Sequence, residues 1–342
     1  MTHASQENSR KKIIEAIQQQ QNHWTIETLS NGILEGNITA LSAAITFSES
    51  TRNVDRVLID GVIEKVMLHS KSTYRVGITG VPGVGKSTLI EQLGLEWIRR
   101  GHKVAILAVD PTSPITQGSI LGDKTRMEQL SLNTNAFIRP SPSSLSLGGV
   151  TAHTHEAILL CEAAGFDRII VETVGVGQSE IAVHDLTDCF LLLMLAGAGD
   201  QLQGIKRGIM EMCDVLAITK ADEQNTHQAK KAQAEYQQAL HLFPAREDGW
   251  YPKVLTTSAI AKSGIVDLID TLENYLQWSL SRGFAHHRMT QKKHLLEQAW
   301  MLHLQKQYAE NSAFQAKWKM VEDQVLQQQI SLAKAISLLK EE

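Results

Sequence analysis

The feature that most constrains the fold is a glycine-rich segment, residues 80–88 (GVPGVGKST), which fits the pattern GxxxxGK[ST]. It directly follows a short apolar run, residues 74–79, and opens a stretch of helical character from Lys86 to about Arg100. In this strand–turn–helix context the pattern predicts a phosphate-binding loop. Glycines let backbone N–H groups approach phosphate oxygens, and the helix N-terminus adds positive potential. The residues predicted to hold the phosphates are Gly80, Gly83, Val84, Gly85, Lys86, Ser87 and Thr88.

Short apolar, β-branched runs alternate with helix-length segments around this loop. Such alternation predicts βαβ units and a mostly parallel sheet with helices on both faces. We therefore expect an α/β fold of the P-loop NTPase kind over residues 73–280. The predicted strands are residues 74–79, 103–109, 168–172, 189–195, 214–219 and 253–257.

Helical patterns flank this domain on both sides. Residues 1–72 are expected to form an N-terminal helical extension, in which Ile13, Ile14 and Ile17 follow helical spacing and Asn37 is a plausible N-cap. Residues 281–342 contain no strand-like run and carry apolar stripes such as Leu296, Trp300, Leu304 and Tyr308. These stripes are compatible with packing onto the sheet domain and with a dimer contact.

Composition excludes several functional classes. The chain has 342 residues, 43% of them hydrophobic and 20% charged, with a net charge of −4, which does not favour a nucleic-acid binder. The N-terminus is polar, and the most apolar run, residues 189–199, is shorter than the roughly 20 residues of a membrane helix. We therefore expect a cytoplasmic protein without a membrane partner.

The cysteines and histidines do not form an obvious metal site. Cys161, Cys189 and Cys213 are widely spaced, which fits neither a disulfide framework nor a zinc site and predicts buried, reduced thiols. His153 and His155 form an HxH pair without further ligands nearby, so a structural or solvated role is expected.

A second motif, residues 219–222 (TKAD), ends the strand predicted at 214–219. An aspartate here can accept hydrogen bonds from the ring N–H and the exocyclic amine of guanine, whereas adenine offers neither donor in that arrangement. Thr219 stands where asparagine is commoner, which predicts the loss of one supporting hydrogen bond. The residues expected to bind the base are Thr219, Lys220 and Asp222, with Ser258 and Ala259 from the end of the next strand.

Carboxylates at strand ends are candidates for the magnesium site that such nucleotidases need. We expect Lys86 to reach the β- and γ-phosphates and the Ser87 hydroxyl to bind Mg²⁺. Asp110, Asp123 and Glu172 are the candidate acids around the metal, and these three with Lys86 form the predicted catalytic set. Glycines in the loop after Glu172 suit a segment that contacts the γ-phosphate and moves when it leaves. The predicted switch glycines are Gly175 and Gly177.

Six longer motifs go beyond the general nucleotidase pattern. They are residues 110–114 (DPTSP), 118–127 (GSILGDKTRM), 137–140 (FIRP), 147–149 (LGG), 171–180 (VETVGVGQSE) and 200–206 (DQLQGIK). Together they closely resemble the MeaB family of G proteins, formerly labelled ArgK or lysine/arginine/ornithine transport ATPase. The sequence departs from the family pattern at Thr219 for Asn, Gln117 for Gly and Ala198 for Gly.

The resemblance implies a GTP-hydrolysing protein that assists adenosylcobalamin-dependent methylmalonyl-CoA mutase. Family members help to load intact cofactor, protect or rescue the mutase, and work as homodimers joined by C-terminal helices. The resemblance also implies that Asp110, Asp123 and Glu172 surround Mg²⁺, and that Gln203 and Lys206 belong to an additional switch loop.

Two other functional classes are alternatives to this one. An ATPase or kinase linked to lysine, arginine and ornithine transport would need adenine recognition, against which Asp222 argues. A metallochaperone GTPase would need a Cys/His cluster, and the cysteines are too scattered for one.

Overall fold

The computed structural model describes residues 24–69, 73–110, 127–142, 147–173, 179–197, 207–222, 224–244, 246 and 249–340. The chain divides into two compact units, Met1–Arg288 and Met289–Glu342, which are described here one at a time. The domain boundaries after residues 72 and 280 stay predictions.

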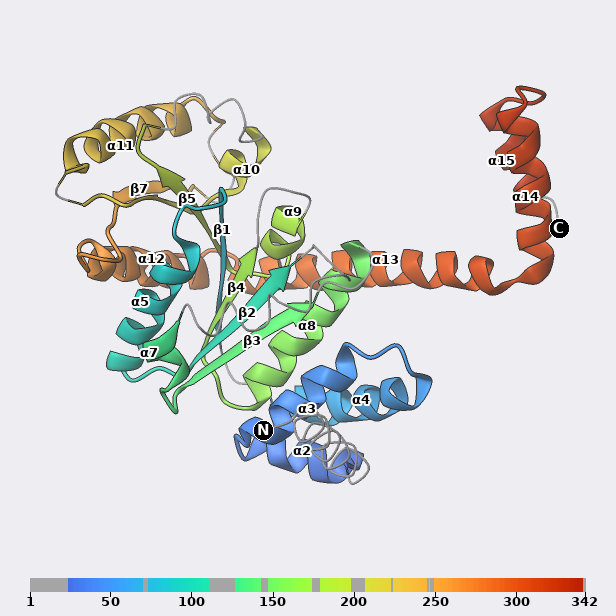
Figure 1. Ribbon diagram of the computed structural model, residues 1–342, viewed down its shortest axis with the longest axis horizontal. Coiled ribbons are helices and arrows are strands. Elements are labelled where there is room, and N and C mark those ends of the chain that lie inside the picture. Colours follow the sequence, from blue (N-terminus) through green and yellow to red (C-terminus); the bar gives the residue numbers. More distant parts are fainter. Residues whose placement is uncertain are drawn as a thin grey trace, which may run out of the picture. The chain divides into compact units, whose positions relative to one another are not determined.

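The larger unit is built on a seven-stranded sheet in the order β3-β2-β4-β1-β5-β6-β7 (Figure 1). All of its strand pairs are parallel, which confirms the predicted α/β architecture. Parallel strands present their carboxyl ends at one edge, and the strand that feeds the glycine-rich loop lies near the middle of that edge. The strands are β1 (Tyr74–Gly80), β2 (Val104–Asp110), β3 (Ala136–Pro142), β4 (Arg168–Thr173), β5 (Cys189–Leu195), β6 (Val215–Thr219) and β7 (Lys253–Thr256).

Strand β3 was not among the six predicted strands. Its last residues include Pro140 and Pro142, which have no backbone N–H. A central strand needs such groups, because it is hydrogen-bonded to a neighbouring strand on each side. In the structure β3 is the edge strand beside β2, where proline is tolerated because only one side of the strand is paired. The prolines argued against a strand in the sequence, and the position of β3 at the edge of the sheet explains why they are tolerated.

Helices cover both faces of this sheet (Figure 1). One face carries α5 (Lys86–Arg99), α7 (Glu128–Ser131) and α12 (Ile265–Leu280). Helix α5 contacts both α7 and α12, and α7 also contacts the edge strand β3. The other carries α8 (Leu147–Ala163), α9 (Ser179–His184), α10 (Arg207–Met212) and α11 (Thr226–His241).

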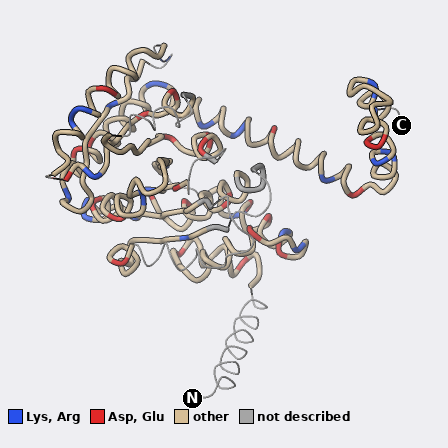
Figure 2. Tube along the Cα trace, turned by 45° about the horizontal axis from the view of Figure 1, so that its top comes forward, with Lys and Arg blue, Asp and Glu red and all other residues tan. Residues whose placement is uncertain are grey.

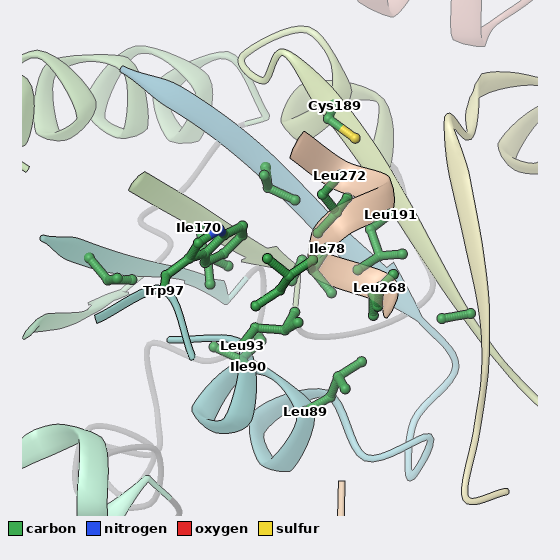
Figure 3. Packing of buried hydrophobic residues seen from close by; sticks show 14 of the residues in the cluster. Ile78, Leu89, Ile90, Leu93, Trp97, Ile170, Cys189, Leu191, Leu268 and Leu272 are labelled. Carbon is green, nitrogen blue, oxygen red and sulfur yellow. The ribbon is translucent and has the colours of Figure 1, made fainter. Parts of the chain in front are cut away.

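The main apolar core lies between the sheet and the helices α5 and α12 (Figure 3). Trp97 of α5 is fully buried there, and its indole Nε1 donates to Glu273 Oε1 at 2.9 Å, so the largest side chain of the core keeps its polar atom paired. Burial of this apolar face fixes α5 on the sheet, and with it the loop at the N-terminus of the helix. Other members of the core are Ile78, Leu89, Ile90, Leu93, Ile170, Leu191, Leu268 and Leu272.

The N-terminal helices α2 (Ile26–Leu34), α3 (Ile38–Ser48) and α4 (Asn53–Val66), followed by the short η1 (Met67–His69), pack against α8. Asn37 caps α3, since its side chain accepts from the N–H groups of Thr39 and Ala40, which confirms the predicted cap. Two ion pairs, Arg56–Glu156 and Arg139–Glu49, also join these helices to the sheet domain. The predicted helical residues Ile13, Ile14 and Ile17 lie outside the described residues.

The last three helices are α13 (Phe284–Glu310), α14 (Ser312–Leu326) and α15 (Leu332–Lys340). Helices α14 and α15 pack on each other and bury Val321 and Ala335. The predicted stripe residues Leu296, Trp300 and Tyr308 are exposed. Charged residues of both signs are interspersed along the described chain (Figure 2). Among the described helices, none combines the length and the apolar character needed to cross a membrane.

The three cysteines are free and buried. Burial raises the pKa of the Cys213 thiol to about 12 and moves the pKa of the Cys161 and Cys189 thiols upward as well. Such thiols stay protonated at neutral pH and are poor nucleophiles, so the prediction of buried, reduced cysteines is confirmed.

Candidate nucleotide-binding site

The glycine-rich loop joins the carboxyl end of β1 to the first turn of α5, as the sequence predicted. Gly85 stands at the N-cap of α5 with φ 94°, a left-handed conformation that favours glycine. At Gly80 a Cβ atom would lie 2.6 Å from the Leu193 carbonyl oxygen of β5, so only glycine lets the loop start this close to the sheet. The loop therefore has the tight backbone that a phosphate cradle requires.

Lys86 lies inside this loop. Its Nζ donates to the Gly80 carbonyl at 2.8 Å and lies 3.5 Å from the Val81 carbonyl, and the residue is 9% exposed. Burial lowers the pKa of Lys86, while the charges of Glu172 and Glu180 act in the opposite direction. A cation held in this way by loop carbonyls can exchange them for phosphate oxygens with little movement of the backbone.

An open pocket lies beside the loop. Its lining brings together residues from β1–α5, from the end of β6 and from the segment after β7, three parts of the chain that are far apart in sequence. Residues of both motifs, GVPGVGKST and TKAD, therefore line one pocket. Eight predicted nucleotide-binding residues line the pocket: Val84, Gly85, Thr88, Thr219, Lys220, Asp222, Ser258 and Ala259.

Asp222 is oriented by the neighbouring segment. The Ser258 hydroxyl donates to Asp222 Oδ1 and accepts from the Ala261 N–H at 3.0 Å, so its proton points to the carboxylate. The backbone reinforces this contact, because the Ala221 N–H donates to the Thr257 carbonyl at 3.0 Å. The carboxylate is thus held at the pocket wall, where it can accept from a base.

Lys220 connects the base segment to the phosphate loop. Its backbone adopts φ 56°, an uncommon conformation for a residue with a side chain, and the Asn225 amide donates to its carbonyl at 3.1 Å. Its Cε lies 4.0 Å from the point where a Cβ of Gly85 would sit, so the aliphatic chain passes over the loop.

Thr219 lies between the base segment and the phosphate loop. Its hydroxyl donates to the Val84 carbonyl at 2.7 Å and lies 3.2 Å from the Met194 carbonyl. The loss of one supporting hydrogen bond relative to asparagine stays a prediction. Thr219 is 4% exposed, and its hydroxyl lies between the glycine-rich loop and β5. A link between the base segment and the phosphate loop is therefore present.

Replacing Thr219 by valine removes this link without changing the shape of the side chain. The Val84 carbonyl then loses its donor in a buried setting, and we expect GDP to bind about tenfold more weakly. Isothermal titration calorimetry of Thr219→Val checks this value, with Thr219→Ser as the control that keeps the hydroxyl. Equal affinities for valine and serine variants would contradict the role of the hydrogen bond.

The candidate metal residues are placed only in part. Glu172 is buried near the end of β4, in register with Ile78 of β1 and Ala108 of β2, so its carboxylate belongs to the edge that carries the phosphate loop. Asp110 ends β2 at the same edge, and Ser87 lies in the first turn of α5. Asp123, Gly175, Gly177, Gln203 and Lys206 lie outside the described residues. Within the described ranges, no three His, Cys, Asp or Glu side chains gather in a group that could hold a metal ion.

Sequence reasoning missed two residues of the pocket wall, Leu89 and Ile260, whereas Thr257 begins the 257–259 segment that matches a loop contacting the guanine carbonyl. Thr257 is 1% exposed, and its hydroxyl has no hydrogen-bond partner among the described residues. Ile260 and Leu89 are aliphatic residues, which no motif marks as binding groups.

Comparisons with known proteins agree with this geometry. The family model described as "Methylmalonyl Co-A mutase-associated GTPase MeaB" matches residues 41–328. A probable GTPase of Mycobacterium tuberculosis is 51% identical over 253 residues, which are 74% of this chain and 75% of that protein. The mouse mitochondrial methylmalonic aciduria type A homolog is 45% identical over 290 residues, 82% of this chain and 69% of that protein.

A solved structure shares the fold. The crystal structure of the LAO/AO transport system kinase is 33% identical, superposes with a TM-score of 0.75, and covers 92% of this chain and 96% of its own. The P-loop NTPase architecture expected from the sequence is thereby confirmed. Because the family model spans most of the chain and close relatives are named as GTPases, the chain belongs to the MeaB family of methylmalonyl-CoA mutase-associated GTPases, and it is a GTPase.

Proposed function

We propose that this GTPase is a switch that assists an adenosylcobalamin-dependent acyl-CoA mutase, methylmalonyl-CoA mutase in the first place, in cofactor loading and protection. The observation that carries the proposal is the family description, which names that mutase, over residues 41–328. The name of the mouse relative, which refers to methylmalonic aciduria, points the same way. Loading and protection are the roles that the MeaB resemblance implies.

The nucleotide chemistry that we assign to the site follows from its residues. The N–H groups of the glycine-rich loop and the Lys86 ammonium would bind the phosphates and offset the charge that develops on them. Asp222 would read guanine, with Ser258 and Ala259 beside it and Lys220 over the loop. The absence of an arginine beside the loop among the pocket-lining residues is consistent with slow intrinsic hydrolysis.

Magnesium is the cofactor that we assign to this site. A hydroxyl and carboxylates are oxygen ligands of the kind that Mg²⁺ prefers, and Ser87 and Glu172 share one edge of the sheet with the end of β2. Ser87, Asp110, Asp123 and Glu172 would hold the ion, which would neutralise phosphate charge. Lys86, Asp110, Asp123 and Glu172 form the proposed catalytic set.

The proposed switch segments follow β4 and β5, the two strands on either side of β1. Gly175 and Gly177 come after β4, and Gln203 and Lys206 come after β5. Loops in these positions can contact the γ-phosphate directly, so loss of that phosphate would change their contacts and bias partner binding. We further propose a cytoplasmic homodimer joined by the C-terminal helices, whose exposed Trp300 and Tyr308 offer apolar surface.

A calorimetric titration with GDP and with ADP, in the presence of Mg²⁺, is the first test. We expect micromolar binding of GDP and no detectable binding of ADP. The second step measures the GTP hydrolysis rate with and without purified apo-methylmalonyl-CoA mutase. We expect the mutase to raise the rate, since a regulatory GTPase with slow turnover is accelerated by its partner. No change in rate and no complex on gel filtration would refute the mutase role and leave the GTPase assignment standing.

One other function has an observation in its favour. The solved structure with the same fold is titled a transport system kinase. A kinase or ATPase of that kind needs to bind adenine nucleotides, so ADP binding as tight as GDP binding would favour it over the switch function. A metallochaperone role, by contrast, has no Cys/His cluster to support it among the described residues.

A further inference from the structure

The segment after β7 presents one aliphatic side chain at the nucleotide pocket. Ile260 lines the same pocket as Asp222 and Ser258, yet 81% of its surface is exposed. Isolated exposed aliphatic residues are common on proteins and need no explanation by themselves. Ile260 differs from those because it forms part of the wall of a ligand site.

The segment holds Ile260 in place through its backbone. Ser258 and Ser263 exchange two backbone hydrogen bonds, of 3.0 and 3.1 Å, which close the turn that carries Ile260. The Ala261 N–H donates to the Ser258 hydroxyl at 3.0 Å, inside the same turn. An ordered turn loses little conformational entropy when a ligand contacts it, so its side chains are suited to binding.

Glycine at position 264 makes this turn possible. Gly264 has φ 70°, and a Cβ atom there would lie 2.3 Å from the Thr256 carbonyl oxygen. Because that oxygen belongs to the backbone of β7, the turn is seated directly on the sheet. Ile260 is thus fixed relative to β6 and β7, the strands that also position Asp222 and Ser258.

We propose that Ile260 is a base-contact residue, packing on the face of the bound guanine ring and becoming buried when GDP or GTP binds. The inference rests on the proposed reading of guanine by Asp222. The two residues have different tasks: Asp222 meets the polar edge of the base and selects it, and Ile260 meets a π-face that every purine has. Ile260 therefore adds affinity without adding selectivity.

The test is the affinity of Ile260→Ala for GDP, measured by calorimetry at several temperatures. Loss of the apolar contact is expected to weaken binding about five- to tenfold and to make the heat-capacity change of binding less negative. Ile260→Leu keeps the apolar area and should stay within about twofold of wild type. Leu242→Ala, which truncates an 85%-exposed leucine outside the pocket, is the matched control and should bind GDP as wild type does.

A second measurement separates a direct contact from an indirect effect through Asp222. Asp222→Asn is expected to bind xanthosine diphosphate, and adding Ile260→Ala should weaken that binding by the same factor as it weakens GDP binding to wild type. Equal factors support a contact with the shared purine face, because independent effects add. Unequal factors would mean that Ile260 acts by placing residue 222, and would overturn the inference.

Failure of this inference can be told apart from failure of the proposed function. If wild type binds GDP, Asp222→Asn loses it and Ile260→Ala binds GDP unchanged, only the role of Ile260 falls. If wild type binds ADP as well as GDP, the guanine assignment falls and takes the inference with it.

Discussion

Asp222→Asn is expected to convert the guanine site into a xanthine site. Xanthine carries a carbonyl where guanine carries its exocyclic amine. The asparagine amide can donate to that carbonyl, whereas it cannot accept from the amine with the same atom. With guanine, one hydrogen bond is replaced by a contact between two donors and the other loses its charged acceptor, so we expect GDP binding to weaken about a hundredfold or more. Xanthosine diphosphate should bind the variant and not the wild type.

The structure indicates that Asp222→Asn changes the chemistry of the side chain without changing its orientation. Ser258 donates to Asp222 Oδ1, and the asparagine carbonyl oxygen can accept the same hydrogen bond, so the side chain keeps its orientation. The measurement is calorimetry with GDP, xanthosine diphosphate and ADP on wild type, Asp222→Asn and Asp222→Ala. The alanine variant should bind neither purine diphosphate tightly. Undiminished GDP binding by Asp222→Asn would show that another residue reads the base.

Arg288→Ala is expected to destabilise the larger unit by about 3–5 kcal/mol. The side chain of Asp188, at the start of β5, is 0% exposed and accepts from Arg288 Nε at 2.8 Å and Nη2 at 2.7 Å. Burial alone would lower the pKa of Arg288, but its hydrogen bonds and charge interaction with Asp188 raise it, so the guanidinium stays protonated. Removing the arginine leaves a buried carboxylate without its cation, and an uncompensated buried charge strongly destabilises the folded state.

The Arg288–Asp188 ion pair has further hydrogen-bond partners. Arg288 Nη2 also donates to the Thr73 carbonyl at 2.8 Å, and the Arg75 N–H donates to Asp188 Oδ2 at 2.8 Å. The start of α13 is thereby fixed to the starts of β1 and β5, at the edge of the sheet away from the nucleotide. Arg288→Lys keeps the charge but not the two-pronged geometry, so it should recover only part of the lost stability.

Urea denaturation followed by circular dichroism measures this effect. Arg282→Ala is the matched control, because Arg282 is exposed and its contact is with the Trp278 ring, 5.6 Å from the centroid. Its truncation should cost within about 1 kcal/mol. Equal urea midpoints of unfolding for Arg288→Ala and Arg282→Ala would contradict a stabilising role of the Arg288–Asp188 ion pair.

Much of the fold could be predicted because its signals are local. The glycine-rich loop needs positions without side chains at fixed spacing, and six strands carry continuous apolar runs, as strands covered on both faces do. The seventh, β3, could not be found in this way. Its prolines argue against a central strand, and only the assembled sheet shows that β3 pairs on one side.

Residues 219–222 show what sequence motifs can and cannot predict. The TKAD motif predicted the position of Asp222 correctly at the end of β6, and the pocket brings it next to Ser258. The sequence did not reveal that the Thr219 hydroxyl donates to the Val84 carbonyl, because whether a hydroxyl reaches a carbonyl depends on how closely two segments pack. Val84 is 135 positions away from Thr219 in sequence, a relation that no motif encodes.

The sequence by itself determined the motifs of this protein: a glycine-rich loop with Lys86, a TKAD segment that ends in Asp222, and long motifs that resemble those of its family. These depend on residue type and spacing, which are local properties. Only the tertiary structure decided which distant groups meet. Asp188 pairs with Arg288 across 100 positions, and Ile260 reaches the pocket wall because its turn is seated on β7. Packing, hydrogen bonding and burial act between neighbours in space, and the order of residues along the chain does not record them.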